Sequence, residues 1–181
     1  MSDSNDFLNA VKRMLWSRDR QDQGKIYAIL DAARDNVIYP KLAESDNKKV
    51  CLLMGAQARE LATVAPYLIE LDEDDPFTQW LLDQGWGKSW GIFAESTATF
   101  VGLRSHFRSF LRVTDEDAKT LFFRYYDPRV LRVFLPTCDR EQIETMFGEV
   151  SRYYAEGKNE KQLIEFVCTE QSKLIENAVN L

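Results

Sequence analysis

Short runs of apolar residues recur through the first two thirds of the chain, separated by polar or glycine-containing segments. Each run has the length of a strand and few polar positions, which is typical of strands that are covered on both faces. Pro66 precedes one of these runs, and Pro is tolerated at the first position of a strand. We predict strands over 26–30, 50–54, 67–71, 90–93 and 121–126.

The segments between these runs predict helices, either from apolar residues at helical spacing or from their content of helix formers. Asp75 before Pro76 and Asp127 before Pro128 each combine a capping residue with a Pro suited to the first helical turn. We expect helices over 6–20, around 37–42, over 56–62, from Pro76 to the Gly85-Trp86-Gly87 segment, and over 96–112, 130–135 and 140–147.

The helix predicted over 96–112 is the most clearly amphipathic one. Its apolar face carries Phe100, Leu103, Phe107 and Leu111. A neighbouring face carries Arg104, Arg108 and Arg112. These arginines form either a basic patch for an acidic partner or ordinary solvated charge.

The end of the chain predicts a β-hairpin, because residues 150–155 and 163–169 alternate on either side of a turn at 156–160. The closing segment through Val179 reads as a short or frayed helix. Strands alternating with helices indicate one α/β or α+β domain with a mixed, partly parallel central sheet. We divide it into an N-terminal helix (1–25), a core (26–147), and a C-terminal hairpin and tail packed on that core (148–181).

Composition narrows the functional classes. The net charge is −6 and the isoelectric point about 4.9, which argues against a nucleic-acid binder. The apolar stretches are too short to span a membrane, and the acidic N-terminus lacks the pattern of a signal peptide. Three widely spaced cysteines fit reduced thiols. We therefore expect a cytoplasmic protein with neither membrane nor nucleic-acid partners.

Residues for catalysis or metal binding do not form a recognisable set. The single histidine, His106, would need a nucleophile and an orienting group, and Cys51 lies within an apolar run typical of a buried thiol. Gly87-Lys88-Ser89 lacks the earlier Gly of a phosphate-binding loop, and the acidic run at 70–75 lacks calcium-loop spacing. We expect no enzyme activity, no metal and no cofactor.

The segment 123–131, Phe-Arg-Tyr-Tyr-Asp-Pro-Arg-Val-Leu, carries more information. Arg124 falls on a predicted buried strand, so it needs a carboxylate or carbonyl partner, for which Asp127 and Asp31 are equally open. Asp127 and Pro128 are placed to start the next helix. Arg124, Asp127 and Pro128 are therefore expected to stabilise the fold.

This segment and four others resemble the type VI secretion effector-chaperone family, also called Tap or TEC adaptors and formerly a domain of unknown function. The other segments are Tyr27-Ala28-Ile29-Leu30-Asp31-Ala32, Ala65-Pro66-Tyr67-Leu68-Ile69, Gly87-Lys88-Ser89-Trp90-Gly91-Ile92-Phe93 and His106-Phe107-Arg108. They stand in the family's order and at similar spacings over about residues 26–147. The resemblance implies that many relatives continue into a further C-terminal lobe, and we expect residues 148–181 to form little more than the hairpin and a tail.

The resemblance implies a non-enzymatic adaptor that binds a toxic type VI effector and promotes its loading onto a VgrG-like spike protein. An adaptor needs an exposed apolar or aromatic surface ringed with charge. The candidate contact residues are Trp86, Arg108, Arg112, Tyr125, Tyr126 and Arg129. The alternatives are a toxin-binding immunity or regulatory protein, and a small hydrolase using Cys51 or His106.

Overall fold

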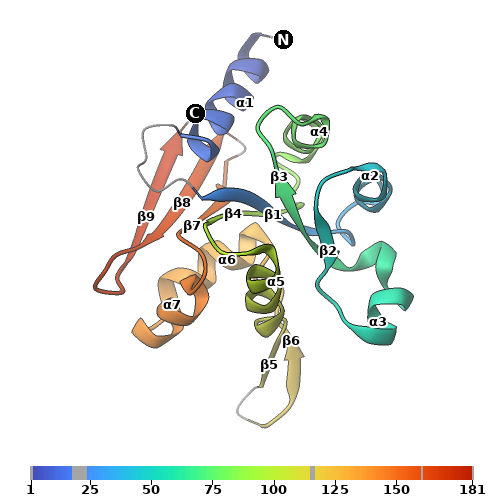
Figure 1. Cartoon of the computed structure of the whole chain (residues 1–181). Coiled ribbons are helices and arrows are strands. Elements are labelled where there is room, and N and C mark those ends of the chain that lie inside the picture. Colours follow the sequence, from blue (N-terminus) through green and yellow to red (C-terminus); the bar gives the residue numbers. More distant parts are fainter. Residues whose placement is uncertain (1, 18–23, 115–116, 160, 181) are drawn as a thin grey trace.

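The apolar runs form the centre of a seven-stranded sheet in the computed structural model, which describes residues 2–17, 24–114, 117–159 and 161–180 (Figure 1). The strands lie side by side in the order β2 (Lys49–Cys51), β3 (Pro66–Leu71), β1 (Lys25–Asp31), β4 (Gly91–Ser96), β7 (Arg152–Glu156), β8 (Gln162–Cys168) and β9 (Leu174–Asn180). The predicted strands over 26–30, 67–71 and 90–93 correspond to β1, β3 and β4. The strand predicted over 50–54 is shorter, half-buried and lies at one edge of the sheet as β2.

The strand directions correct one prediction. Every strand pair in the described part of this sheet is antiparallel, so the expectation of a partly parallel sheet is wrong. The chain leaves β1 through helix α2 (Ile38–Glu44), β2, α3 (Gly55–Glu60) and the 3₁₀ turn η1 (Ala62–Val64). Strand β2 runs in the same direction as β1, and the chain reverses after it through α3 and η1, so β3 runs antiparallel to both of its neighbours. The mixed α/β content is as predicted.

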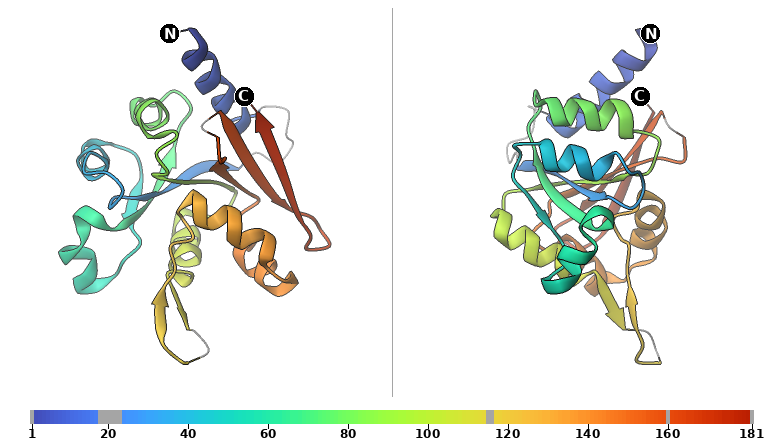
Figure 2. Two further views of the ribbon diagram at one scale, coloured as in Figure 1. Left: turned by 180° about the vertical axis from the view of Figure 1, so that it is seen from behind. Right: turned by 90° about the vertical axis from the view of Figure 1, so that its right-hand side faces the viewer.

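Helices cover both faces of the sheet, as Figures 1 and 2 show. Helices α1 (Ser2–Leu15) and α4 (Pro76–Gly85) lie on one side. Helices α5 (Phe100–Ser109), α6 (Pro128–Phe134) and α7 (Arg140–Phe147) lie on the other, with the 3₁₀ turn η2 (Leu135–Thr137) between the last two. The predicted helices are present, but α1 begins four residues before its predicted start and ends at Leu15, and α5 is shorter than expected. The predicted end of the first helix at residue 20 lies outside the described residues.

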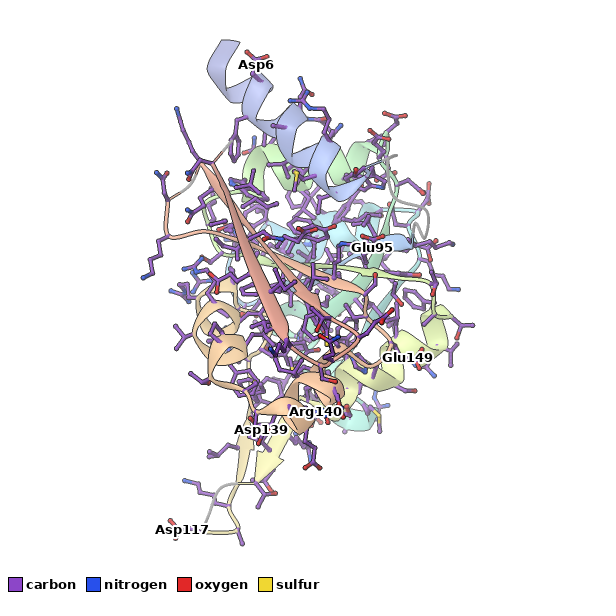
Figure 3. All side chains as sticks on the ribbon, turned by 90° about the vertical axis from the view of Figure 1, so that its left-hand side faces the viewer. Asp6, Glu95, Asp117, Asp139, Arg140 and Glu149 are labelled. Atoms are coloured by element: carbon purple, nitrogen blue, oxygen red, sulfur yellow. The ribbon has the colours of Figure 1, made fainter. Side chains whose placement is uncertain are left out.

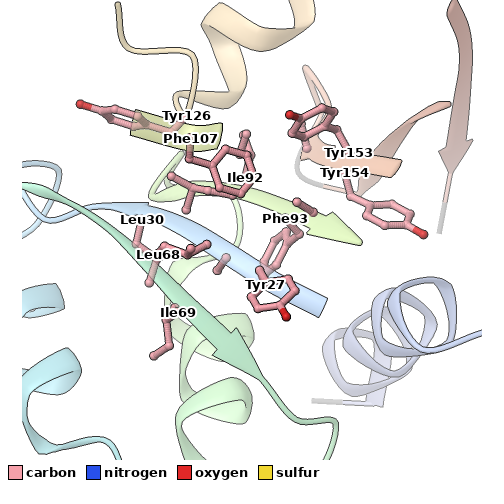
Figure 4. Close-up of a cluster of buried hydrophobic side chains, with 14 of the residues drawn as sticks. Tyr27, Leu30, Leu68, Ile69, Ile92, Phe93, Phe107, Tyr126, Tyr153 and Tyr154 are labelled. Atoms are coloured by element: carbon pink, nitrogen blue, oxygen red, sulfur yellow. The ribbon is translucent and has the colours of Figure 1, made fainter. Parts of the chain in front are cut away.

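The core forms because strand residues alternate between these two helical layers (Figure 4). Ile92 and Tyr153 face α5, where the rings of Phe107 and Tyr153 lie 6.4 Å apart. Phe93 faces the other way and stacks on Trp86, which in turn contacts Phe7 of α1. Strand β4 is consequently buried along its whole length, as its uninterrupted apolar start predicts.

The strand predicted over 121–126 is wrong in place and extent. Residues Thr120–Phe122 form β6, which pairs only with β5 (Arg112–Thr114) in a separate two-stranded hairpin. Figure 3 places Asp117 at the far end of this hairpin, away from the main sheet. The chain after β6 turns, with the amide of Asp127 donating to the carbonyl of Arg124 at 3.1 Å. The aromatic residues Phe123, Tyr125 and Tyr126 favour a strand by propensity, but here they lie in or beside a turn. Tyr125 stacks on Phe107 of α5, and Phe123 and Tyr126 pack against Tyr125.

The C-terminal hairpin is confirmed as β7 and β8, and its turn includes residue 160, which lies outside the described residues. The closing segment is strand β9, so the prediction of a helical or frayed tail is wrong. Strand β7 pairs with β4, and the hairpin thereby continues the central sheet.

The predicted division of the chain into an N-terminal helix, a core and a C-terminal part, with boundaries at 25/26 and 147/148, remains a prediction. Across the described residues, the helices are all too short or too polar to cross a bilayer.

Candidate functional site

The Phe123–Arg129 segment is anchored to β1 by one ion pair and contains a second. Arg124 donates to the carboxylate of Asp31, which is 1 % exposed at the end of β1 and also accepts from the amide of Ala33 at 3.1 Å. The hydrogen bond to Asp31 is the main cause of a raised Arg124 pKa. Of the two partners that the sequence left open for Arg124, the structure selects Asp31. The guanidinium thus ties the loop before α6 to the central strand.

Asp127 starts α6, as predicted. Its Oδ1 accepts from the backbone amide and the Nε of Arg129, both at 2.9 Å, and Pro128 occupies the first turn. Burial opposes ionisation of Asp127, but the hydrogen bonds from Arg129 outweigh it and lower its pKa. Arg129 is therefore already engaged with its own helix cap, although half of its side chain is exposed.

A groove opens beside this loop, between α3–η1 and the β5–β6 hairpin. It consists of two hollows of about 310 and 280 Å³ that share four lining residues, Leu53, Gln57, Arg112 and Phe122. The first hollow extends to Asp31, Arg124, Leu61 and Val64. The second extends to Met54, Arg108 and Leu111. Because the hollows share walls, we treat them as one surface, called here the α3–hairpin groove.

Four large apolar side chains of the groove are exposed to solvent. Met54 is 64 % exposed, and Leu61, Val64 and Phe122 are each 43–48 % exposed. Scattered apolar residues are normal on protein surfaces, but a contiguous group with charged neighbours is typical of an interaction site. The groove therefore has the composition of a polypeptide contact surface.

Arg108 and Arg112 both reach this groove, but they do different things. The guanidinium of Arg108 donates to the carbonyls of Cys51 at 2.8 Å, Leu52 at 3.1 Å and Leu53 at 3.4 Å, which fixes the β2–α3 connection against α5. Arg112 donates to Gln57 Oε1 at 2.8 Å and is otherwise exposed. Arg108 consequently braces the groove, whereas Arg112 presents charge along its rim.

Of the other predicted contact residues, Tyr126 lines the first hollow of the groove, whereas Trp86, Tyr125 and Arg129 line neither hollow. Tyr125 and Tyr126 are 0 % and 2 % exposed, and Tyr125 donates from its hydroxyl to the carbonyl of Phe107 at 2.8 Å. Both rings are therefore mainly core residues. Trp86 is half-buried between Phe7 and Phe93, on the sheet face opposite α5, so it is not part of the groove. The partner roles of all six predicted contact residues stay predictions.

Cys51 and His106 are not brought together. His106 belongs to α5, and its Nε2 lies 3.1 Å from the carbonyl of Met146 in α7. Arg108, two residues later and so on the opposite side of α5, donates to the carbonyl of Cys51 in β2. Burial lowers the pKa of His106 and raises that of the Cys51 thiol, which keeps both groups neutral. Within the described residues, no three His, Cys, Asp or Glu side chains gather as metal ligands would.

Sequence reasoning missed the apolar side of the groove. Met54, Gln57, Leu61 and Val64 recur at intervals of three and four residues, a helical stripe hidden inside a segment that was notable only for its helix formers. The pattern could have been found from spacing. Its exposure could not, because an apolar stripe usually indicates a face turned to the core.

The fold and groove define an α/β protein with a surface suited to binding another polypeptide. The chain belongs to the family described as "Domain of unknown function (DUF4123)", which matches residues 26–145. That range runs from β1 into α7 and contains the whole α3–hairpin groove. No curated protein and no solved structure was found to match the chain.

Proposed function

We propose that this chain is a type VI secretion adaptor that binds a toxic effector and promotes its loading onto the spike protein. The family match over residues 26–145 carries the proposal, because the family is associated with effector adaptors of type VI secretion. The α3–hairpin groove supports it with an exposed apolar surface and arginine on its rim. In this proposal the chain acts by binding in the cytoplasm and catalyses no reaction.

The proposal is tested by co-purification from the native bacterium. The tagged chain should recover the effector encoded beside it, together with the spike protein, in stoichiometric amounts. Deleting the gene should abolish delivery of that effector while leaving delivery of an unrelated effector intact. A folded chain that captures neither protein would contradict the proposal. Protection of toxin-expressing cells in the absence of the spike would instead identify an immunity protein.

A further inference from the structure

One wall of the α3–hairpin groove has the spacing of a helix-packing ridge. Met54, Gln57, Leu61 and Val64 are separated by three, four and three residues; Gln57 lies within α3, Met54 and Leu61 flank it, Val64 ends η1, and all four line the groove. Such ridges usually pack against another helix, yet Met54, Leu61 and Val64 are exposed.

The opposite wall is the β5–β6 hairpin. Arg112 and Phe122 are direct cross-strand partners, so their side chains share one face of the hairpin, and both line the groove. Phe122 supplies an exposed ring and Arg112 bridges to Gln57 at one point. Buried Leu53 and Leu111 lie between these walls. The groove thus has apolar side chains on both walls and an apolar floor, and a single helix can pack one apolar face against them.

The charge of the groove is opposite to that of the chain. The chain carries a net charge of −6, but the charged side chains lining the described hollows are three arginines and one carboxylate. That carboxylate, Asp31, is buried and neutralised by Arg124. Arg112 is exposed and 47 % of the Arg124 side chain remains accessible, so both can donate to carboxylates of a partner.

We propose that the α3–hairpin groove binds an amphipathic helix of the effector, whose apolar stripe packs on Met54, Leu61, Val64 and Phe122 and whose acidic side chains meet Arg112 and Arg124. This inference rests on the proposed adaptor function and names the part of the partner that is recognised. Apolar burial supplies the affinity, and the arginines set the orientation of the helix and favour acidic partners.

Two single variants test the groove in the purified complex of the chain with its neighbouring effector. Leu61→Glu places a charge on the ridge, and Arg112→Glu reverses the rim charge, so each should weaken effector binding by about tenfold or more. The matched controls are Val133→Glu, at an exposed valine of α6, and Arg140→Glu, at an exposed arginine of α7, since neither residue lines the groove. Circular dichroism and thermal melting establish that all four variants are folded, and calorimetry measures the Kd.

The class of the bound segment is tested by crosslinking and rescue. A photoreactive residue at position 61 should crosslink to one effector segment, and alanine substitutions there should weaken binding with a period of three to four residues. Exchanging an acidic residue of that segment for lysine should restore binding to Arg112→Glu. Unchanged affinity of the folded Leu61→Glu and Arg112→Glu variants, or sensitivity at every second effector residue, overturns the helix inference while the adaptor function stands. Failure of the unmodified chain to bind the effector overturns both.

Discussion

Glu156 is a carboxylate held in an unusual environment at the end of β7. It is 6 % exposed and accepts hydrogen bonds from the backbone amides of Ser89, at 3.0 Å, and Gly87. Burial raises its pKa to about 7 against the opposing effect of these amides. The turn it holds contains two residues in the left-handed region, Gly87 at φ +80° and Ser89 at φ +55°. The carboxylate therefore links the proton concentration to the stability of a strained turn.

Replacement of Glu156 by Gln should remove this pH dependence. Because the folded-state pKa lies above the ordinary value, the stability contributed by protonation is complete at low pH and is lost as the pH rises through about 7. The free energy of unfolding of the wild type should therefore fall relative to the Gln variant, on the order of 2 kcal/mol between pH 5 and pH 8. Urea unfolding across this range measures it, with exposed Glu141→Gln as the control. Parallel pH profiles for wild type and Glu156→Gln would refute the assignment.

At the scale of elements, β1 and β4 approach each other closely at Gly91. A Cβ at this position would lie 2.2 Å from the carbonyl oxygen of Ile29, which is backbone and cannot move aside without displacing the strand. Gly91 pairs with Leu30 at the start of β4, and both residues are buried. The glycine is therefore required by the distance between the two strands.

Gly91→Ala should destabilise the chain by about 1–3 kcal/mol or more, because the added methyl group forces the strands apart in a closely packed region. Gly102→Ala on α5 is the matched control and should change the stability by less than about 1 kcal/mol, since its nearest neighbour is the Thr99 hydroxyl at 3.3 Å. Thermal and urea unfolding compare the two. Equal stability of Gly91→Ala and wild type would show that β1 and β4 separate at little cost.

The sequence predicts most elements but not how the strands pair. Continuous apolar runs identify β1, β3 and β4, and the Asp-Pro pairs mark the starts of α4 and α6. Strand direction is decided by tertiary pairing, here by the insertion of β3 antiparallel between β1 and β2. The helix predicted for the closing segment is wrong because Leu174, Ile175, Ala178 and Val179 have a spacing that is also compatible with a helix. Pairing with β8 makes this segment a strand.

At the scale of the whole molecule, the choice between adaptor and hydrolase depends on whether any residue performs chemistry. Cys51→Ala combined with His106→Ala should leave effector delivery within about twofold of wild type. The two side chains contact different sides of α5, and burial raises the pKa of the Cys51 thiol, which disfavours the reactive thiolate. A bacterial competition assay measures delivery, and thermal melting verifies the fold of the double variant. Loss of delivery by a folded double variant would favour the hydrolase hypothesis.

The groove could be predicted from the sequence only in part. Arg108 and Arg112 stood out because they recur at helical spacing, and both line the groove. The roles of Tyr125 and Tyr126 could not be read from composition, since an aromatic side chain serves equally in a core and in an interface. The opposite wall, at Met54, Leu61 and Val64, depends on how α3 is placed against the hairpin, which only the folded chain establishes.

The position of β4 in the sheet has a consequence for synthesis on the ribosome. One edge of β4 pairs with β1, which precedes it in the chain, but the other edge pairs with β7, which is synthesised later. Helices α5, α6 and α7 are translated in the interval and cover a face of the sheet without pairing that edge. Until Arg152–Glu156 emerges, the nascent chain therefore displays an open strand edge, the kind of surface through which unfinished β-sheets join to one another. Translation that stops before Arg152 leaves a product prone to aggregation.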